Sequence, residues 1–217
     1  MRFDTPNGPL EACISDVTVA GWTGRDRAAV NHHIEELAAI GVSPPSQIPL
    51  YYRVSHGLLT QNRVIQVLGS ETSGEVEPLV IRSGGALYLG LASDHTDRAL
   101  EVTSVAASKQ ICAKPAASAL WPLEDLEDHL DAIQMTTEIE TRSGWTRYQE
   151  GTLAAIRPLP DLITDAALPD GAAMLCGTLP AIGGVRPAER YRMALVDPVK
   201  GRSITLEYDV ANLPIVA

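Results

Sequence analysis

The chain has 217 residues, of which 45% are hydrophobic and 20% charged, as in an ordinary globular domain. Its net charge of −10, with no local cluster of lysine or arginine, argues against nucleic acid as a partner, because phosphates would repel the chain. No apolar run approaches bilayer length, and the N-terminus has no apolar signal core, so we expect no membrane association. The three cysteines are too sparse for a disulfide framework, which favours a reducing, cytoplasmic location. We therefore expect one domain spanning residues 1–217.

The first half of the chain is predicted to contain several strands and one helix. Asp26 is a plausible N-cap for a helix over residues 27–40, which Gly41 ends. Ser83, Gly84 and Gly85 form a tight-turn signal that predicts a β-hairpin. The strands expected in this half cover residues 11–22, 48–54, 64–68, 75–81 and 86–91.

The second half is predicted to contain one short helix and more strands. Residues 123–133 have the spacing of a short amphipathic helix. The strands expected here cover residues 134–142, 172–176, 191–196 and 203–208. The predicted fold class is α+β, mostly β, with one helix early in the chain and one in the middle.

Three carboxylates form the first candidate site. Glu75 and Glu77 are two residues apart in a predicted strand, so their side chains share one face, and the return strand of the hairpin could bring Asp94 beside them. Converging carboxylates without thiolate or imidazole suit a hard cation. Spacing alone favours two solvated surface glutamates instead. His95 is expected to point to the opposite face, and Asp97 is either a further ligand or a partner of Arg98.

A histidine and a glutamate on the predicted helix form the second candidate site. His33 and Glu36 are three residues apart and so are neighbours on one helical face, where the carboxylate would orient the imidazole as a general base. His32 and Glu35 have the same spacing, which leaves the choice of base open. A surface charge pair is the alternative for either set.

The order of short motifs along the chain resembles that of the fumarylacetoacetate hydrolase superfamily. The resemblance runs from about residue 20 to the C-terminus. The matching motifs are Gly24-Arg25-Asp26, His33-x-x-Glu36, the extended segment Pro45–Val54, Glu75-x-Glu77, Asp94 with Arg98, Lys109 ahead of Pro115, Gln149-Glu150-Gly151, Gly177-Thr178-Leu179-Pro180, and a final hairpin from Tyr191 to Tyr208.

This resemblance implies a mixed β-roll with a few short helices, a homodimer, and a Mg²⁺ or Mn²⁺ cofactor that Ca²⁺ can replace in crystals. The implied substrate is a small oxo acid. The implied activity is hydrolysis of a C–C bond in an acylpyruvate or related β-dicarbonyl acid through a metal-stabilised enolate. The residues that the resemblance assigns are Glu75, Glu77 and Asp94 to the metal; His33, Glu36 and Lys109 to catalysis; and Arg98, Gln149 and Thr178 to the substrate.

Several alternatives remain at this level. The same kind of site supports a decarboxylase, a hydratase or dehydratase, or an isomerase of a 2-oxo acid. A non-catalytic oxo-acid-binding protein and a structural protein without metal are further options. Lys114 competes with Lys109 for the active-site role. The stretches from Glu77 to Asp94 and from Arg98 to Lys109 are shorter than in typical members, which puts the substrate in question.

Overall fold

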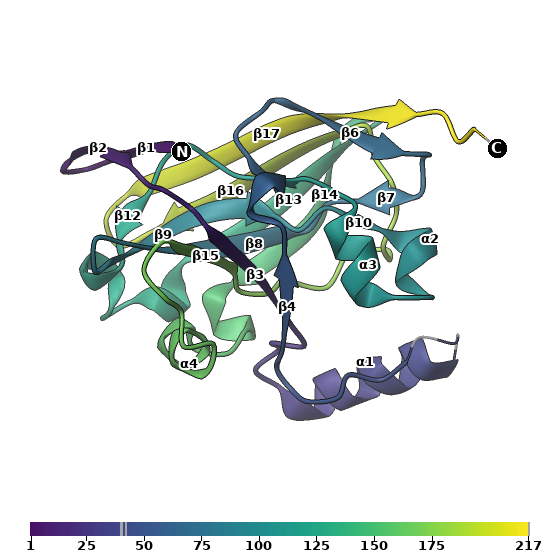
Figure 1. Cartoon of the computed structure of the whole chain (residues 1–217), viewed down its shortest axis with the longest axis horizontal. Helices are drawn as coiled ribbons and strands as arrows, with labels where there is room; N and C mark the ends of the chain where they lie inside the picture. Colours follow the sequence, from purple (N-terminus) through teal and green to yellow (C-terminus); the bar gives the residue numbers. More distant parts are fainter. Residues whose placement is uncertain (40, 42, 217) are drawn as a thin grey trace.

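Two β-sheets form the body of the molecule in the computed structural model (Figure 1). The structure describes residues 1–39, 41 and 43–216; within helix α1 it describes the backbone but not the side chains at positions 33, 36 and 37. The six-stranded sheet has the order β12 (Trp121–Pro122), β9 (Ala86–Ser93), β8 (Val76–Ser83), β15 (Ala172–Leu175), β3 (Asp16–Gly21), β4 (Leu50–Val54). The five-stranded sheet has the order β14 (Gly144–Thr152), β13 (Gln134–Thr141), β16 (Arg190–Asp197), β17 (Arg202–Leu213), β6 (Val64–Leu68).

Short strand pairs and helices surround the two sheets. The pairs are β1 (Arg2–Thr5) with β2 (Gly8–Glu11), β7 (Thr72–Ser73) with β10 (Thr96–Asp97), and β5 (Leu59–Thr60) with β11 (Lys114–Pro115). The α-helices are α1 (Arg27–Ala39), α2 (Arg98–Glu101), α3 (Val105–Gln110) and α4 (Leu159–Asp165). The 3-10 turns are η1 (His56–Leu58), η2 (Leu123–Leu126), η3 (Leu130–Ala132) and η4 (Leu153–Ala155). No helix in the described part of the chain combines the length and the hydropathy needed to cross a membrane.

The six-stranded sheet is buried on both faces. Along β8, Val76 and Val80 enter the main core, which also holds apolar side chains of the five-stranded sheet. Leu79 and Ile81 point the other way, into a second cluster that includes Phe3 from β1. Because successive side chains of a strand alternate between faces, a strand buried on both sides appears as an unbroken apolar run. The second face is the one that carries the candidate site.

Most of the predicted elements are present. The Asp26 carboxylate accepts the Ala28 amide at 2.8 Å, so the predicted N-cap of α1 is confirmed. The strands predicted over 48–54, 64–68, 86–91 and 134–142 correspond to β4, β6, β9 and β13, and the three C-terminal strands correspond to β15, β16 and β17. The β8–β9 hairpin turns through Gly84 and Gly85, whose φ angles of 60° and 81° suit a two-residue primed turn.

Three predictions differ from the structure. The strand predicted over 11–22 is two elements, since β2 ends at Glu11 and β3 begins at Asp16. The helix predicted over 123–133 is wrong: two 3-10 turns replace it, separated by His129 at φ −146°. The His129 ring lies 3.1 Å from the buried Asp197 carboxylate. We attribute the break between the two turns to this tertiary contact. Helices α2, α3 and α4 were not predicted, and α3 carries a residue of the site.

Candidate active site

Strand pairing gathers the candidate residues at one end of the six-stranded sheet. Glu77 in β8 pairs with Ala92 in β9, and Asp94 lies two residues beyond Ala92, so Glu77 and Asp94 share a face. On the other side of β8, Leu79 pairs with Leu175 of β15, which leads into the Gly177 loop on the same face. The hairpin predicted from the glycine turn therefore does place the two acids together.

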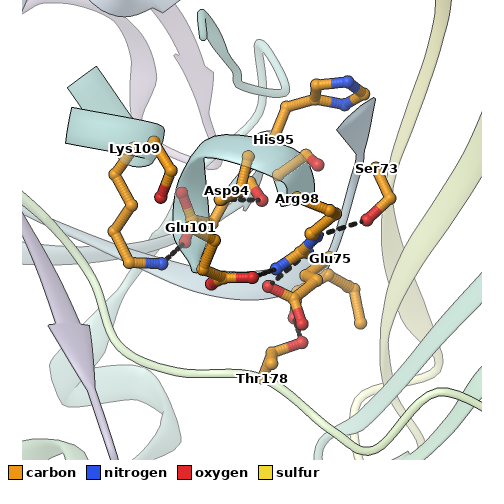
Figure 2. Close-up of polar contacts among 12 residues, drawn as sticks. Ser73, Glu75, Asp94, His95, Arg98, Glu101, Lys109 and Thr178 are labelled. Atoms are coloured by element: carbon orange, nitrogen blue, oxygen red, sulfur yellow. Dashed lines mark hydrogen bonds and ion pairs between the residues drawn. The ribbon is translucent and has the colours of Figure 1, made fainter. Parts of the chain in front are cut away.

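Glu75 reaches the site from outside the strand that was predicted to hold it. Strand β8 begins at Val76, and Glu75 lies in the extended segment before it, with its side chain 16% exposed. Arg98 Nη2 lies 3.0 Å from Glu75 Oε2, while Nη1 donates to Glu101 at 3.0 Å and Nε donates to Ser73 Oγ at 2.7 Å (Figure 2). Arg98 is thus held by three partners and orients Glu75.

Asp94 is completely buried and faces two ammonium groups. Lys109 Nζ donates to Oδ2 at 2.5 Å, and Lys114 Nζ lies 2.9 Å from Oδ1. Burial by itself would raise the pKa of Asp94, but Lys109 and Lys114 outweigh it and hold that pKa well below its usual range. Asp94 is therefore a carboxylate anion in the folded protein.

The pKa of Glu77 is shifted in the opposite direction to that of Asp94. Its side chain is buried, and Oε2 accepts the Gly177 amide at 2.8 Å. Burial, and next the nearby Asp94, raise the pKa of Glu77 well above its ordinary value, although Lys109 and the Gly177 amide act in the other direction. Lys109 and the Gly177 amide therefore do not offset the combined effect of burial and of Asp94 on the pKa of Glu77.

Two lysines occupy the region where sequence reasoning had left a choice. Lys114, in β11, is fully buried, and besides its ion pair with Asp94 its ammonium donates a hydrogen bond to the His95 carbonyl at 2.6 Å. Lys109, in α3, is 7% exposed, and Figure 2 shows its ammonium pointing toward the carboxylates from the side opposite Arg98. Lys109 is thus the more exposed of the two lysines beside Asp94, and its role in the site stays a prediction.

Gln149 and Thr178 are placed close together but are already bonded within the protein. The Gln149 carbonyl accepts from Val76 N and Thr137 Oγ1, both at 2.9 Å, and its amide donates to Thr178 Oγ1 at 2.9 Å and to Leu179 O at 2.6 Å. Thr178 Oγ1 in turn donates to the Val76 carbonyl at 2.8 Å. Gln149 therefore positions the Thr178 loop rather than facing the site with a free amide.

His95 and Asp97 take structural positions. The His95 ring is buried between Tyr208 Oη at 3.1 Å and Thr72 Oγ1 at 2.8 Å, and Figure 2 shows it pointing away from the carboxylates. Burial, followed by the charge of Lys114, lowers the pKa of His95 to about 3, so the ring is neutral at pH 7. Asp97 caps α2 by accepting the Leu100 amide. The expected opposite-face placement of His95 is confirmed.

Sequence reasoning missed the wall that Trp22, Thr23 and Tyr52 form beside the site. The Trp22 indole donates to Tyr52 Oη at 3.3 Å, and Trp22 has φ 61°, which is rare for a bulky residue. The Lys109 ammonium lies 5.7 Å from the centre of the Tyr52 ring. A Cβ on Gly177, whose φ is 110°, would lie 1.7 Å from Thr23 Oγ1, so only glycine fits there. No spacing pattern points to these contacts.

The predicted base lies outside the described side chains. The backbone of α1 includes positions 33 and 36, but the side chains of His33 and Glu36 are not described, so their role stays a prediction. Cys112 and Cys176 are buried, as expected for packing residues, and burial raises the pKa of the Cys112 thiol to about 11. A hollow of about 320 Å³ beside Arg25 and His129 includes none of the site residues above.

The donor set fits a hard divalent cation in type. Glu75, Glu77 and Asp94 offer only carboxylate oxygens, the ligands that Mg²⁺ and Mn²⁺ prefer. The buried Oδ1 of Asp94 accepts no hydrogen bond from the residues that the structure describes, although Lys114 Nζ lies 2.9 Å from it. Among the side chains that the structure describes, no three from His, Cys, Asp and Glu converge closely enough to hold an ion. Three cations of the described part of the chain, Arg98, Lys109 and Lys114, face these carboxylates instead.

The sequence comparison decides the family. Residues 20–208 match the family described as "Protein of unknown function (DUF2848)". The chain belongs to this DUF2848 family. No curated protein matches the sequence significantly.

Solved structures share the fold at low sequence identity. "Crystal structures of Cg1458" is 13% identical with a TM-score of 0.65, and 98% of each chain is covered. A 2-keto-3-deoxy-D-arabinonate dehydratase complexed with magnesium and 2,5-dioxopentanoate is 15% identical with a TM-score of 0.63, covering 96% of this chain and 76% of that one. The 4-oxalocrotonate decarboxylase from Pseudomonas putida G7, complexed with calcium and acetate, is 13% identical with a TM-score of 0.56, covering 94% and 78%. The predicted fold class, a mostly-β fumarylacetoacetate-hydrolase-like roll, is confirmed.

Proposed function

We propose that this DUF2848 protein is a divalent-metal-dependent enzyme of the fumarylacetoacetate hydrolase superfamily that acts on a small 2-oxo acid. The observation that carries the proposal is the cluster of Glu75, Glu77 and the buried Asp94, with Lys109 facing it. The proposal is supported by the fold shared with a dehydratase that was solved with magnesium and a dioxo acid, and with a decarboxylase solved with calcium.

The three carboxylates would hold the metal. Glu75, Glu77 and Asp94 provide hard oxygen donors that suit Mg²⁺ or Mn²⁺, with Ca²⁺ as a substitute. A bound divalent cation supplies Lewis-acid chemistry, polarising the oxo group of the substrate. Arg98 would fix the Glu75 carboxylate, since it already bonds that group at 3.0 Å. Its role is therefore positioning rather than direct binding of substrate.

The other residues would bind and orient the oxo acid. The Lys109 ammonium faces the site and would stabilise negative charge that develops on a substrate oxygen. The loop at Gly177 and Thr178 would contribute backbone amides to the substrate carboxylate. Gln149 would keep that loop in place through its bonds to Thr178 and Leu179. The wall of Trp22 and Tyr52 would exclude water from one side.

Hydrolysis of a C–C bond in an acylpyruvate is the reaction that uses all the predicted residues. His33, oriented by Glu36, would take a proton from the water that attacks the distal carbonyl. The C–C bond then breaks, its electron pair passes to the pyruvate part as an enolate, and a proton returns to that carbon. Dehydration and decarboxylation, the activities named for two structural neighbours, need no attacking water. A dehydratase still needs a base for a carbon-bound proton, so the acid that is turned over, rather than the need for His33, separates these reactions.

Calorimetry with Mn²⁺ and then oxalate, a mimic of the pyruvate enolate, tests the site. Wild type is expected to bind Mn²⁺ and to bind oxalate only when Mn²⁺ is present. Glu77→Gln should weaken Mn²⁺ binding by roughly tenfold or more, because it removes one charged ligand. Glu138→Gln is the matched control, because Glu138 lies in β13 with its side chain 30% exposed. A wild type that binds no Mn²⁺, or an unchanged Glu77→Gln, would overturn the proposal.

An activity panel then separates the reactions. Acylpyruvates, 2-keto-3-deoxy sugar acids and oxalocrotonate-type acids should be offered to wild type and to His33→Ala. Loss of activity in His33→Ala is expected for hydrolysis. A wild type that binds oxalate tightly but turns over none of these acids would instead be an oxo-acid-binding protein. Light scattering tests the accompanying proposal that the chain is a homodimer.

A further inference from the structure

Two of the three lysines of the chain are committed to one carboxylate. Lys109 and Lys114 both approach Asp94, with Nζ at 2.5 Å from Oδ2 and 2.9 Å from Oδ1. Lys200, the third lysine, is 40% exposed and lies near Asp125. Both oxygens of Asp94 therefore already face a positive charge. A divalent ion at an Asp94 oxygen would therefore lie close to an ammonium group and be repelled by it, unless one of the two lysines moves away.

Lys114 is the less able of the two to move. Its side chain is fully buried, and its ammonium also donates to the His95 carbonyl at 2.6 Å. Moving it would leave that carbonyl without its donor inside the protein, which is costly. Lys114 is also anchored in β11, which pairs with β5. The position of Lys114 is therefore set by the core.

Lys109 has the freedom that Lys114 lacks. It belongs to the last turn of α3, its side chain is 8% exposed, and its only hydrogen bond that the structure describes is the one to Asp94. Its ammonium lies 5.7 Å from the centre of the Tyr52 ring, within the range of a cation–π contact. The Trp22 indole donates to the Tyr52 hydroxyl at 3.3 Å, which helps to hold this ring in place beside the ammonium.

The charges around Lys109 are those that would surround the metal. Asp94, Glu75 and Glu77 all act on the Lys109 ammonium. An ammonium and a divalent ion at the same carboxylate would repel each other strongly in this buried setting. In the metal-free form, the described side chains include no group of three His, Cys, Asp or Glu residues that is ready to hold an ion.

We propose that Lys109 is a built-in cation that occupies the place of the divalent metal at Asp94 and moves aside towards Tyr52 when the metal binds. The inference rests on the proposed metal site. In the metal-free form Lys109 would neutralise Asp94, and in the metal-bound form the divalent ion would do so. Without metal, the Lys109 ammonium would balance the negative charge of the carboxylates. After leaving Asp94, it would be free to contact the substrate.

Lysine labelling of the wild-type protein tests the exchange directly. The three lysines can be followed separately by mass spectrometry after a short pulse of acetic anhydride, with and without Mn²⁺. Labelling of Lys109 is expected to rise severalfold with Mn²⁺, because the ammonium leaves Asp94. Lys114 should stay protected and Lys200 should stay reactive in both states, which makes them internal controls. Labelling of Lys109 that is unchanged or lower with Mn²⁺ would overturn the proposal.

A variant tests the same exchange through affinity and stability. Lys109→Met keeps the length of the side chain without its charge, and Lys200→Met is the control. Lys109→Met should bind Mn²⁺ roughly tenfold more tightly than wild type, because the ion no longer displaces a cation. Its metal-free form should melt at a lower temperature than metal-free wild type, and saturating Mn²⁺ should remove this difference in melting temperature. Affinity equal to or below that of wild type would contradict the inference.

The two proposals fail differently. If neither wild type nor Lys109→Met binds Mn²⁺, the metal site itself is refuted, and the exchange with it. If both bind Mn²⁺ with the same affinity and Lys109 labelling does not change, the metal site stands and only the exchange is refuted.

Discussion

Replacing Lys114 by methionine tests whether this fully buried lysine stabilises the fold. The change removes the ion pair to Asp94 at 2.9 Å and the hydrogen bond to the His95 carbonyl at 2.6 Å. Removing one partner of a buried pair typically costs 3–5 kcal/mol, and Lys109 still compensates Asp94, so we expect a loss of about 3 kcal/mol. For a chain of this length that corresponds to a melting temperature lower by about 6–12 °C.

The assay is urea unfolding followed by circular dichroism, with scanning calorimetry as a second measurement. Asp94→Asn combined with Lys114→Met should cost more than Lys114→Met alone, because it also leaves the buried Lys109 ammonium without its carboxylate. The reasoning would be refuted if Lys114→Met were as stable as wild type. In that case the cost of burying the ammonium would equal or exceed its attraction to Asp94, as happens for some buried ion pairs.

Three further predictions concern backbone, pH and thiols. Gly177→Ala should lower the free energy of unfolding by about 2–5 kcal/mol, since it adds a clash with Thr23 to a positive φ, whereas Gly201→Ala, which has open space, should cost only about 1–2 kcal/mol. The folded pKa of His95 is about 3 against 6.5 unfolded, so the unfolded chain binds the extra proton. Below pH 6.5, stability should thus fall by up to about 1.4 kcal/mol per pH unit, a slope that His95→Asn should remove. Ellman's reagent should label Cys13 alone rapidly in the native protein and all three cysteines in denaturant; three fast thiols in the native state would refute the buried placement of the other two.

Local patterns in the sequence predicted most of the strands. Short apolar runs between glycine and proline turns identify β4, β6, β9 and β13, because strand side chains alternate and turns need special backbone angles. The same reasoning failed at residues 123–133, where apolar spacing favours a helix. There the contact between His129 and Asp197, which are far apart in sequence, decides the local backbone.

The candidate site also combines features that the sequence predicted with features that only the structure shows. The resemblance in motif order proposed Glu75, Glu77, Asp94 and Lys109 as site residues. The structure places Glu77 and Asp94 on one face of the sheet, because they lie on a hairpin whose turn is encoded locally. The roles of Arg98 and Gln149 were predicted as substrate contacts, but the structure shows their polar groups bonded to other residues of the protein. Hydrogen-bond saturation depends on distant partners, which no local pattern contains.

By itself, the sequence determined the strands, the hairpin and the presence of three acids that could meet. Only the tertiary structure decided how charge is distributed among them. It placed two lysines on Asp94, one of them fully buried and bonded to the His95 carbonyl, the other in the last turn of α3. The alternation of side chains between the two faces of a strand is a local property of the sequence. Burial, and the competition of cations for one carboxylate, arise only when separate segments pack together.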